Sequence, residues 1–202
     1  RSKVLAPQIV KLPTLPANHD IHHLRAAIKH CINFSVAVDG GAHRGHWTRI
    51  LLQSFDEVWA FEPHHPHFIE LPDNSNNFNA ALGVSDGRMG MLPGPHNDGQ
   101  WYLHGEGETE ILALDDLNLP DCGLLKLDVE GFEYFALQGA EETIKKFRPL
   151  IMIEENGLCQ KYGVKPGDCD TLIKGWRYRM VQRKNKDFIY LPRECCPSTS
   201  GF

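Results

Sequence analysis

The sequence contains no apolar run close to the ~20 residues that a membrane-spanning helix requires. It also lacks an excess of basic residues, since 26 Asp and Glu outnumber 21 Lys and Arg and give a formal net charge of −5. Nucleic-acid-binding surfaces normally show clustered Lys and Arg, so we expect neither a nucleic acid nor a membrane as a partner. No signal-peptide segment precedes the first motif, and a cytoplasmic location is the default expectation.

The six cysteines lack the paired spacing of a zinc site. Cys31, Cys122, Cys159 and Cys169 are scattered, and two adjacent cysteines at 195–196 lie in a polar tail. Free thiols in a reducing compartment are therefore the favoured interpretation. No internal repeat or low-complexity segment is visible, and 202 residues are enough for about one domain.

A glycine-rich turn directly after a short apolar strand is the most informative motif. Gly40, Gly41 and Gly45 lack a Cβ, so they can take positive φ and let a cofactor lie against bare backbone. The pattern Gly-x-Ala-x-x-Gly differs from the dinucleotide fingerprint at Ala42, where a glycine normally lets the backbone approach a pyrophosphate. Asp39 adds a negative charge at the same place. Both residues favour a cofactor with a positive centre and no diphosphate, such as S-adenosylmethionine (SAM).

Two further strand ends supply groups that suit a nucleoside. Glu62 is expected at the tip of the second strand, where a carboxylate holds a ribose diol. A third strand is expected over residues 77–83, and there Asn79 and Ala80 could border an adenine ring. NAD and SAM both contain this ribose, so Glu62 alone does not choose between them.

Charged residues interrupt the next apolar strand in a regular way. Side chains alternate along a strand, so Lys126, Asp128 and Glu130 are expected on one face. Three charges on an otherwise apolar strand are costly unless they are paired or lie at a cleft. Another apolar run ends at Glu154, and ligands of parallel sheets bind beyond the carboxyl ends of the strands. These residues are thus catalytic candidates, with a buried ion network as the alternative interpretation.

These motifs together resemble a known family. The motifs are Asp39-Gly40-Gly41-Ala42-x-x-Gly45, Phe61-Glu62-Pro63, Asn79-x-Ala81-Leu82-Gly83, Leu114-Asp115-Asp116-Leu117, Lys126-x-Asp128-Val129-Glu130-Gly131-x-Glu133, Gly139-Ala140 and Arg148-Pro149-x-Ile151-x-Ile153-Glu154. They resemble the FkbM-type branch of class I SAM-dependent methyltransferases. The resemblance implies an α/β, Rossmann-like fold with a mostly parallel seven-stranded sheet, a C-terminal antiparallel hairpin and helices on both faces. It also implies methyl transfer from SAM, typically to a hydroxyl oxygen of a sugar, glycan or other small molecule.

Roles in such a reaction can be assigned to individual residues. We expect Asp128 to be the general base, Lys126 to keep it ionised, and Glu130 and Glu154 to orient acceptor hydroxyls. Glu133 is expected to cap the helix that follows. The cofactor-binding residues are predicted to be Asp39, Gly40, Gly41, Ala42, Gly45, Glu62, Pro63, Asn79 and Ala80.

Three alternatives remain open at this point. Asp128, Glu155 and Asn156 resemble the Mg²⁺ ligands of catechol-type O-methyltransferases, a less favoured interpretation. A nicotinamide-dependent oxidoreductase would explain the glycine turn and Glu62 but not Ala42. A non-catalytic SAM-binding protein would keep the cofactor residues and lose the acceptor cleft. The acceptor and the oligomeric state are not determined by the sequence.

The chain is predicted to divide into an N-terminal arm and helix (1–35), a methyltransferase domain (36–192) and a polar tail (193–202). Asp20 is expected to cap a short helix. Residues 89–107 are predicted to form an irregular insertion, in which Trp101 and Tyr102 are candidates for contacting the acceptor. The imidazoles of residues 64–67 are interpreted as a surface cluster in preference to a cofactor border. The apolar face of the short helix is expected to contain Ile21, Leu24, Ile28 and Ile32.

Overall fold

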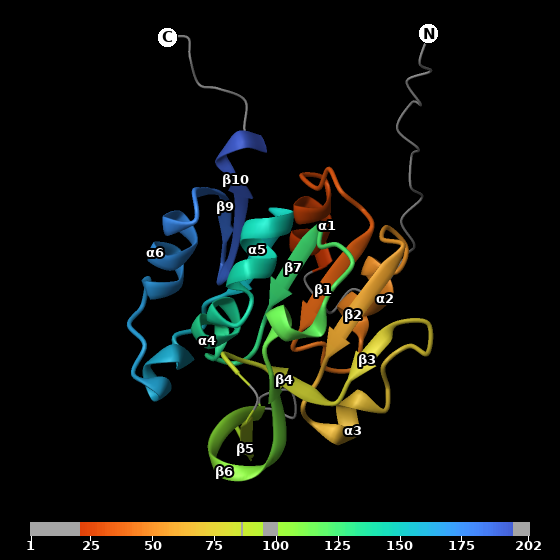
Figure 1. Ribbon diagram of the computed structural model, residues 1–202. Helices are drawn as coiled ribbons and strands as arrows, with labels where there is room; N and C mark the ends of the chain where they lie inside the picture. Colours follow the sequence, from red (N-terminus) through yellow and green to blue (C-terminus); the bar gives the residue numbers. More distant parts are fainter. Residues whose placement is uncertain (1–20, 86, 95–100, 196–202) are drawn as a thin grey trace, which may run out of the picture.

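The computed structural model describes residues 21–85, 87–94 and 101–195, and a seven-stranded sheet forms its centre (Figure 1). Its strands are β1 (Val36–Gly40), β2 (Glu57–Phe61), β3 (Asn76–Phe78), β7 (Leu124–Leu127), β8 (Leu150–Glu154), β9 (Tyr178–Lys184) and β10 (Asp187–Pro192). The order is β3-β2-β1-β7-β8-β10-β9. The first five strands in this order are parallel, while β10 is antiparallel to both β8 and β9. The predicted fold class is thus confirmed, including the C-terminal hairpin.

Helices pack on both faces of this sheet. They are α1 (Ile21–Ile28), α2 (His46–Leu51), α3 (His65–Phe68), α4 (Glu133–Gln138), α5 (Glu141–Phe147) and α6 (Asp168–Gly175), with 3₁₀ turns η1 (Leu114–Leu117), η2 (Leu158–Tyr162) and η3 (Arg193–Cys195). Residues of α1 and α2 pack against one face of the sheet, whereas α4, α5 and α6 pack against the other. Among the described residues, no helix is long and apolar enough to cross a membrane.

Side chains that alternate along each central strand contribute to the hydrophobic cores on both faces of the sheet. Ala37 and Leu124 face the core with α1 and α2, while Val38 and Leu125 face the core with α4 to α6. This is the period-two pattern expected of a strand that is buried on both sides. Asp39 and Lys126 are paired in register on neighbouring strands and follow the parity of Ala37 and Leu124. Both charged residues therefore point toward α2.

A second, three-stranded sheet lies below the first in Figure 1 and contains most of the segment predicted to be irregular. Its strands are β4 (Ala80–Leu82), β5 (Gly87–Pro93) and β6 (Trp101–Leu112), in the order β4-β6-β5. The prediction of an irregular insertion over 89–107 is wrong, because β5 and β6 pair as an antiparallel hairpin with a register shift after Met89. The single third strand expected over 77–83 is also wrong. The chain leaves the main sheet at Asn79 and enters the small one.

The predicted N-terminal helix is present but ends earlier than its apolar pattern indicated. Leu24 and Ile28 are buried in the core, as expected, whereas Ile32 is 82% exposed beyond the end of α1. Asp20, its predicted cap, lies outside the described residues. Among the cysteines in the described part of the chain, Cys31, Cys122, Cys159 and Cys169 are free thiols, as predicted.

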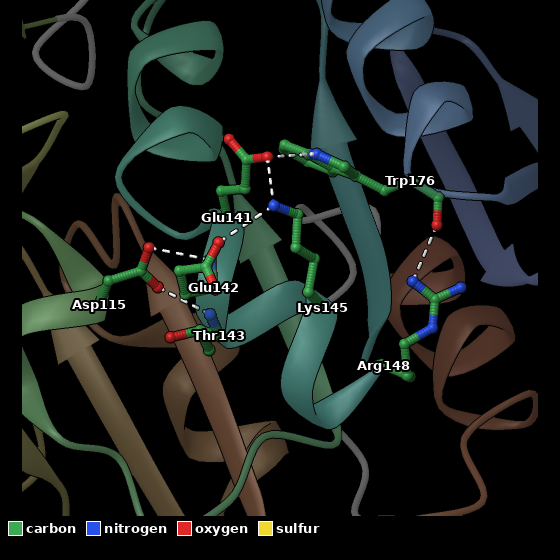
Figure 2. A network of polar contacts seen from close by, with 7 residues as sticks. All are labelled: Asp115, Glu141, Glu142, Thr143, Lys145, Arg148 and Trp176. Carbon is green, nitrogen blue, oxygen red and sulfur yellow. Dashed lines mark hydrogen bonds and ion pairs between the residues drawn. The ribbon is translucent and has the colours of Figure 1, made fainter.

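The Leu-Asp-Asp-Leu motif at 114–117 has a structural role at the start of α5. Asp115 accepts hydrogen bonds from the backbone N–H groups of Glu142 (3.0 Å) and Thr143 (2.8 Å), which the helix itself leaves without acceptors (Figure 2). Glu141 accepts a hydrogen bond from the Trp176 indole at 3.1 Å and so joins α5 to the end of α6. This network holds the helix that packs behind β7 and β8.

Candidate functional site

A cavity of about 350 Å³ lies at the carboxyl ends of the parallel strands. The chain order of the sheet reverses between β1 and β7, and such a switch point is where open α/β sheets bind ligands. Gly41 and Ala42 from the end of β1 line this cavity, together with Glu62 and Pro63 from the end of β2. All three predicted catalytic residues line it too: Asp128, Glu130 and Glu154.

The remaining predicted cofactor residues do not line the cavity. Asn79 donates hydrogen bonds to the carbonyls of Glu62 (2.8 Å) and Pro63 (3.1 Å), so it fixes the loop that carries them. Ala81 and Leu82, which follow in β4, contact the cavity directly. The predicted residues outside the lining are Asp39, Gly40, Gly45, Asn79 and Ala80. Their role in cofactor binding stays a prediction.

The glycine turn is pressed against the end of β7. Gly41 has φ +72°, and a Cβ there would lie 1.8 Å from the carbonyl oxygen of Asp128. The N–H groups of Gly41 and Ala42 both donate to the Phe61 carbonyl at 3.0 Å, which ties the turn to β2. Only a glycine fits this position, and the turn presents bare backbone to the cavity.

Glu62 is held in one orientation at the tip of β2. Its two carboxylate oxygens accept hydrogen bonds from the backbone N–H groups of His43 (2.7 Å) and His64 (2.8 Å). Burial raises the pKa of Glu62 to about 6, against the effect of these two hydrogen bonds. A carboxylate fixed at the tip of the second strand is suited to a ribose diol, as the sequence predicted.

Asp39 and Lys126 form a buried ion pair beneath the turn. The Lys126 Nζ atom lies 2.8 Å from Asp39 Oδ1, and Thr48 Oγ1 donates to Asp39 Oδ2 at 2.7 Å. The sequence suggested that Lys126 would pair with Asp128. It pairs instead with Asp39, because both side chains point toward α2 whereas Asp128 follows the end of β7.

The carboxyl groups at the ends of β7 and β8 form a cluster. Burial, together with the Asp128 carboxylate with which it shares a hydrogen bond, raises the pKa of Glu154 to about 8. Burial and the same carboxylate raise the pKa of Glu130 to about 7. Asn156 Nδ2 donates to Glu130 Oε2 at 2.9 Å and lies 3.5 Å from Glu154 Oε2. The Glu154 carboxyl therefore keeps its proton to a higher pH than an ordinary glutamate does.

The loop after β7 has a constrained backbone. The strand ends at Leu127, so Glu130 is not part of it and instead has a left-handed φ of +54°. Glu133 accepts hydrogen bonds from the N–H groups of Val129 (3.1 Å) and Gly131 (3.2 Å), so it fixes the loop before α4 and does not cap that helix as predicted. Non-glycine residues with a left-handed φ, such as Glu130, are uncommon and are found preferentially at functional sites. Here it directs Glu130 into the cavity.

The sequence did not predict that imidazole and indole rings pack together on one side of the cavity. The His67 ring lies 4.0 Å from the His43 ring and 4.3 Å from the His64 ring, measured between centroids. Trp101 stacks on His64 at 4.0 Å and lines the cavity, whereas Tyr102 lies beneath Lys161 at a separate hollow. Contact of either ring with an acceptor stays a prediction. His67 is only 1% exposed, so the interpretation of residues 64–67 as a surface cluster is wrong for this residue.

Lys186 is a second lining residue that sequence reasoning missed. It lies in the turn of the β9–β10 hairpin. The antiparallel pairing of Asp187 with Glu154 places this turn beside the carboxyl end of β8. The position of Lys186 could therefore have been predicted from the antiparallel direction of the last strand.

The three residues of the Mg²⁺ alternative differ in their position relative to the cavity. Asn156 lines the cavity with Asp128, but Glu155 does not. The neighbouring charges of Glu155 are Asp170 and Arg183, outside the cavity. In the described ranges, no group of three or more His, Cys, Asp or Glu side chains is arranged to hold a metal ion.

The raised pKa of Glu154 predicts a pH dependence of stability. Because its folded-state pKa is about 8 instead of the ordinary 4.5, the folded protein binds an extra proton between these values. The free energy of unfolding should therefore fall as pH rises through this window. Glu154→Gln should flatten this part of the curve, measured by urea denaturation at pH 5 to 9. An equally steep fall in the variant would contradict the assignment.

Comparison with known families agrees with this site. The model of the family described as "Methyltransferase FkbM domain" matches residues 108–180, which include β7, β8 and the carboxyl cluster. The match covers 73 of the 202 residues and agrees with the resemblance of the motifs to FkbM-type methyltransferases. A search of curated proteins found no match.

Solved structures share the fold at low sequence identity. The methyltransferase FkbM from Methylobacillus flagellatus KT has a TM-score of 0.56 and 17% identity, covering 78% of this chain and 43% of its own. A precorrin-6y C5,15-methyltransferase from Geobacter metallireducens GS-15 has a TM-score of 0.51 and 12% identity, covering 89% and 92%. An rRNA methylase from Streptococcus thermophilus has a TM-score of 0.50 and 14% identity, covering 87% and 96%. The chain thus spans less than half the length of the Methylobacillus protein.

Proposed function

We propose that the protein transfers the methyl group of SAM to a hydroxyl oxygen of a sugar, glycan or other small molecule, with Asp128 as the general base. The hydrogen-bonded Asp128–Glu154 pair beside the glycine turn is the observation that carries this proposal. It supplies a proton acceptor within a cavity at the switch point of the sheet. The family match over residues 108–180 supports methyl transfer, and the acceptor is inferred from the residues of the cavity.

The residues at the donor side fit SAM. Gly41 leaves bare backbone where a Cβ would collide, and Glu62 supplies a fixed carboxylate for the ribose. The carboxylates around the cavity also suit the positive sulfonium centre, whereas they would repel a pyrophosphate. Ala42 and Pro63 complete this side of the lining. When bound, SAM supplies an activated methyl group.

The protein's part is then to align the acceptor and remove its proton. The Asp128 carboxylate accepts the hydroxyl proton as the oxygen forms its bond to the methyl group. Protonated Glu154 donates a hydrogen bond to Asp128 and so holds the carboxylate in one orientation. Glu130, fixed by Asn156, is left to accept a hydrogen bond from a second acceptor hydroxyl. Trp101 and Phe132 provide apolar surface in the same cavity, which suits the faces of a sugar ring.

Glu62 provides the first test of the donor site. Glu62→Ala should weaken SAM binding by about tenfold or more, because two charge-assisted contacts to the ribose would be lost. Isothermal titration calorimetry with SAM, S-adenosylhomocysteine and NAD would measure this and distinguish the cofactors. Glu57→Ala, an exposed residue of the same strand, is the matched control. Equal SAM affinity of both folded variants would remove Glu62 from the cofactor site.

The acceptor is tested by following labelled methyl groups. Wild-type protein is incubated with labelled SAM and a panel of glycans, free sugars and hydroxylated metabolites, and the product is analysed by mass spectrometry. Transfer to oxygen supports the proposal, while transfer to carbon or nitrogen overturns it. SAM binding without transfer to any member of the panel would favour the non-catalytic alternative.

A further inference from the structure

The ammonium group of Lys126 is surrounded by three oxygens. Nζ lies 2.8 Å from Asp39 Oδ1 and donates hydrogen bonds to the carbonyls of Gly40 at 3.2 Å and Gly41 at 2.8 Å. A lysine has three N–H donors, so these contacts account for all of them. Lys126 is 3% exposed and Asp39 is fully buried. The lysine therefore fixes the positions of both carbonyl groups of the glycine turn, an arrangement that we call the lysine clamp.

The surroundings keep this clamp charged. Burial alone would lower the pKa of Lys126, but the Asp39 and Asp128 carboxylates outweigh it, so the pKa lies above the ordinary value. Thr48 holds the second oxygen of Asp39 at 2.7 Å and fixes its orientation from α2. The Trp47 ring covers the ammonium with its centroid 5.3 Å away. A neutral amine at this place would keep only two N–H donors for the three oxygens and would leave the buried Asp39 carboxylate without a balancing charge.

The clamped turn is also in direct contact with the backbone of the proposed base. The Asp128 N–H donates to the Gly40 carbonyl at 3.1 Å, the same oxygen that Lys126 contacts. Gly41 lies so close to the Asp128 carbonyl that no Cβ fits between them. The position of the turn relative to Asp128 is therefore set by a small group of contacts at one point, with Lys126 at its centre.

We propose that Lys126 is a positioning residue that holds the cofactor turn and the base in register, so that the donor methyl group and the acceptor oxygen are aligned. This role rests on the proposed function. It differs from charge compensation alone, in which Lys126 only neutralises buried Asp39. The two roles are separable because the clamp needs the ammonium at the carbonyls of Gly40 and Gly41, whereas charge compensation needs only a net balance.

A pair of variants separates them. Lys126→Met leaves Asp39 charged and unpaired, so it should lower both the melting temperature and the affinity for SAM. Adding Asp39→Asn removes the unpaired charge and should recover most of the melting temperature. The affinity for SAM should stay about tenfold or more below wild type, and kcat should stay reduced by a similar factor, since the carbonyls have lost a charged donor. Calorimetry, steady-state kinetics and circular dichroism measure the three quantities.

Two further variants complete the test. Lys174→Met removes an exposed ion pair to Asp170 of equally short length, 2.7 Å, and should change neither SAM affinity nor kcat. Thr48→Val keeps both buried charges but releases Asp39, and should raise the KM for SAM by a smaller factor, about threefold, the equivalent of one weak hydrogen bond.

The outcomes also separate this role from the proposed function as a whole. Wild-type SAM affinity and kcat in the stable double variant, or an unchanged KM in Thr48→Val, would overturn the positioning role. Absence of SAM binding by the wild type would instead overturn the proposed function, and this role with it.

Discussion

Asp128→Asn is expected to reduce kcat by about 10²- to 10⁴-fold, the usual contribution of a general base. The substitution keeps the size of the side chain and removes only its ability to take a proton. Asp128 follows the end of β7 and lines the cavity through its side chain. SAM affinity should therefore stay near the wild-type value, measured by calorimetry on the same preparations that are used for kinetics.

Glu154→Gln is the matched control for this prediction. Glutamine keeps an N–H donor toward Asp128 but cannot ionise, so most of the activity should remain at neutral pH. In the wild type, ionisation of Glu154 near pH 8 removes this donor, and kcat should fall above that pH. Loss of melting temperature in Asp128→Asn with unchanged turnover per folded molecule would show that the cluster is only an ion network.

The metal-assisted alternative predicts a different result. If Mg²⁺ lowers the pKa of the acceptor hydroxyl, EDTA should abolish turnover and added Mg²⁺ should restore it. The proposed mechanism predicts full activity after chelation. The comparison is made on wild-type protein that has been dialysed against EDTA and then assayed with and without added metal.

Gly41→Ala is expected to abolish measurable SAM binding. Its Cβ would lie 1.8 Å from the Asp128 carbonyl oxygen, and the residue has a φ of +72° that L side chains rarely adopt. The turn must move away from β7, and the Lys126 contacts to Gly40 and Gly41 would be broken at the same time. Overpacking of this kind costs typically about 1–3 kcal/mol of stability, so a reduced melting temperature is expected as well.

Gly175→Ala provides the control for this substitution. Gly175 ends α6, a Cβ there would meet no atom within 4 Å, and no positive φ is required. Both variants are compared by calorimetry with SAM and by thermal unfolding. Wild-type SAM affinity in folded Gly41→Ala would show that the turn is not part of the cofactor site.

The main sheet could be predicted because its signals are local. The apolar strand at β1 and the hairpin of β9 and β10 were recognisable from composition and alternation. The small sheet was missed because β6 carries glycines and charged side chains over most of its length, with few inward apolar residues such as Leu103 and Ile111. Its stability depends on pairing with β4 and β5, which are distant in sequence from parts of it.

The candidate site could be predicted only in part, for a related reason. Residues at strand ends, such as Glu62 and Asp128, were placed correctly because parallel strands share a carboxyl edge. The pairing of Lys126 with Asp39 depends on the register between β1 and β7, which no local pattern specifies. The burial of His67 depends in the same way on the small sheet, since Trp101 reaches the imidazole cluster from β6.

The residues that line the cavity come from both sheets. The glycine turn and the carboxyl cluster are built on the main sheet, whereas Met91, Trp101 and Leu103 reach the cavity from the hairpin of β5 and β6. Sequence changes in this hairpin leave the contacts around Asp39 and Lys126 intact. Under the proposed function, substitutions in this hairpin would change the acceptor side of the cavity without altering the residues assigned to the methyl donor.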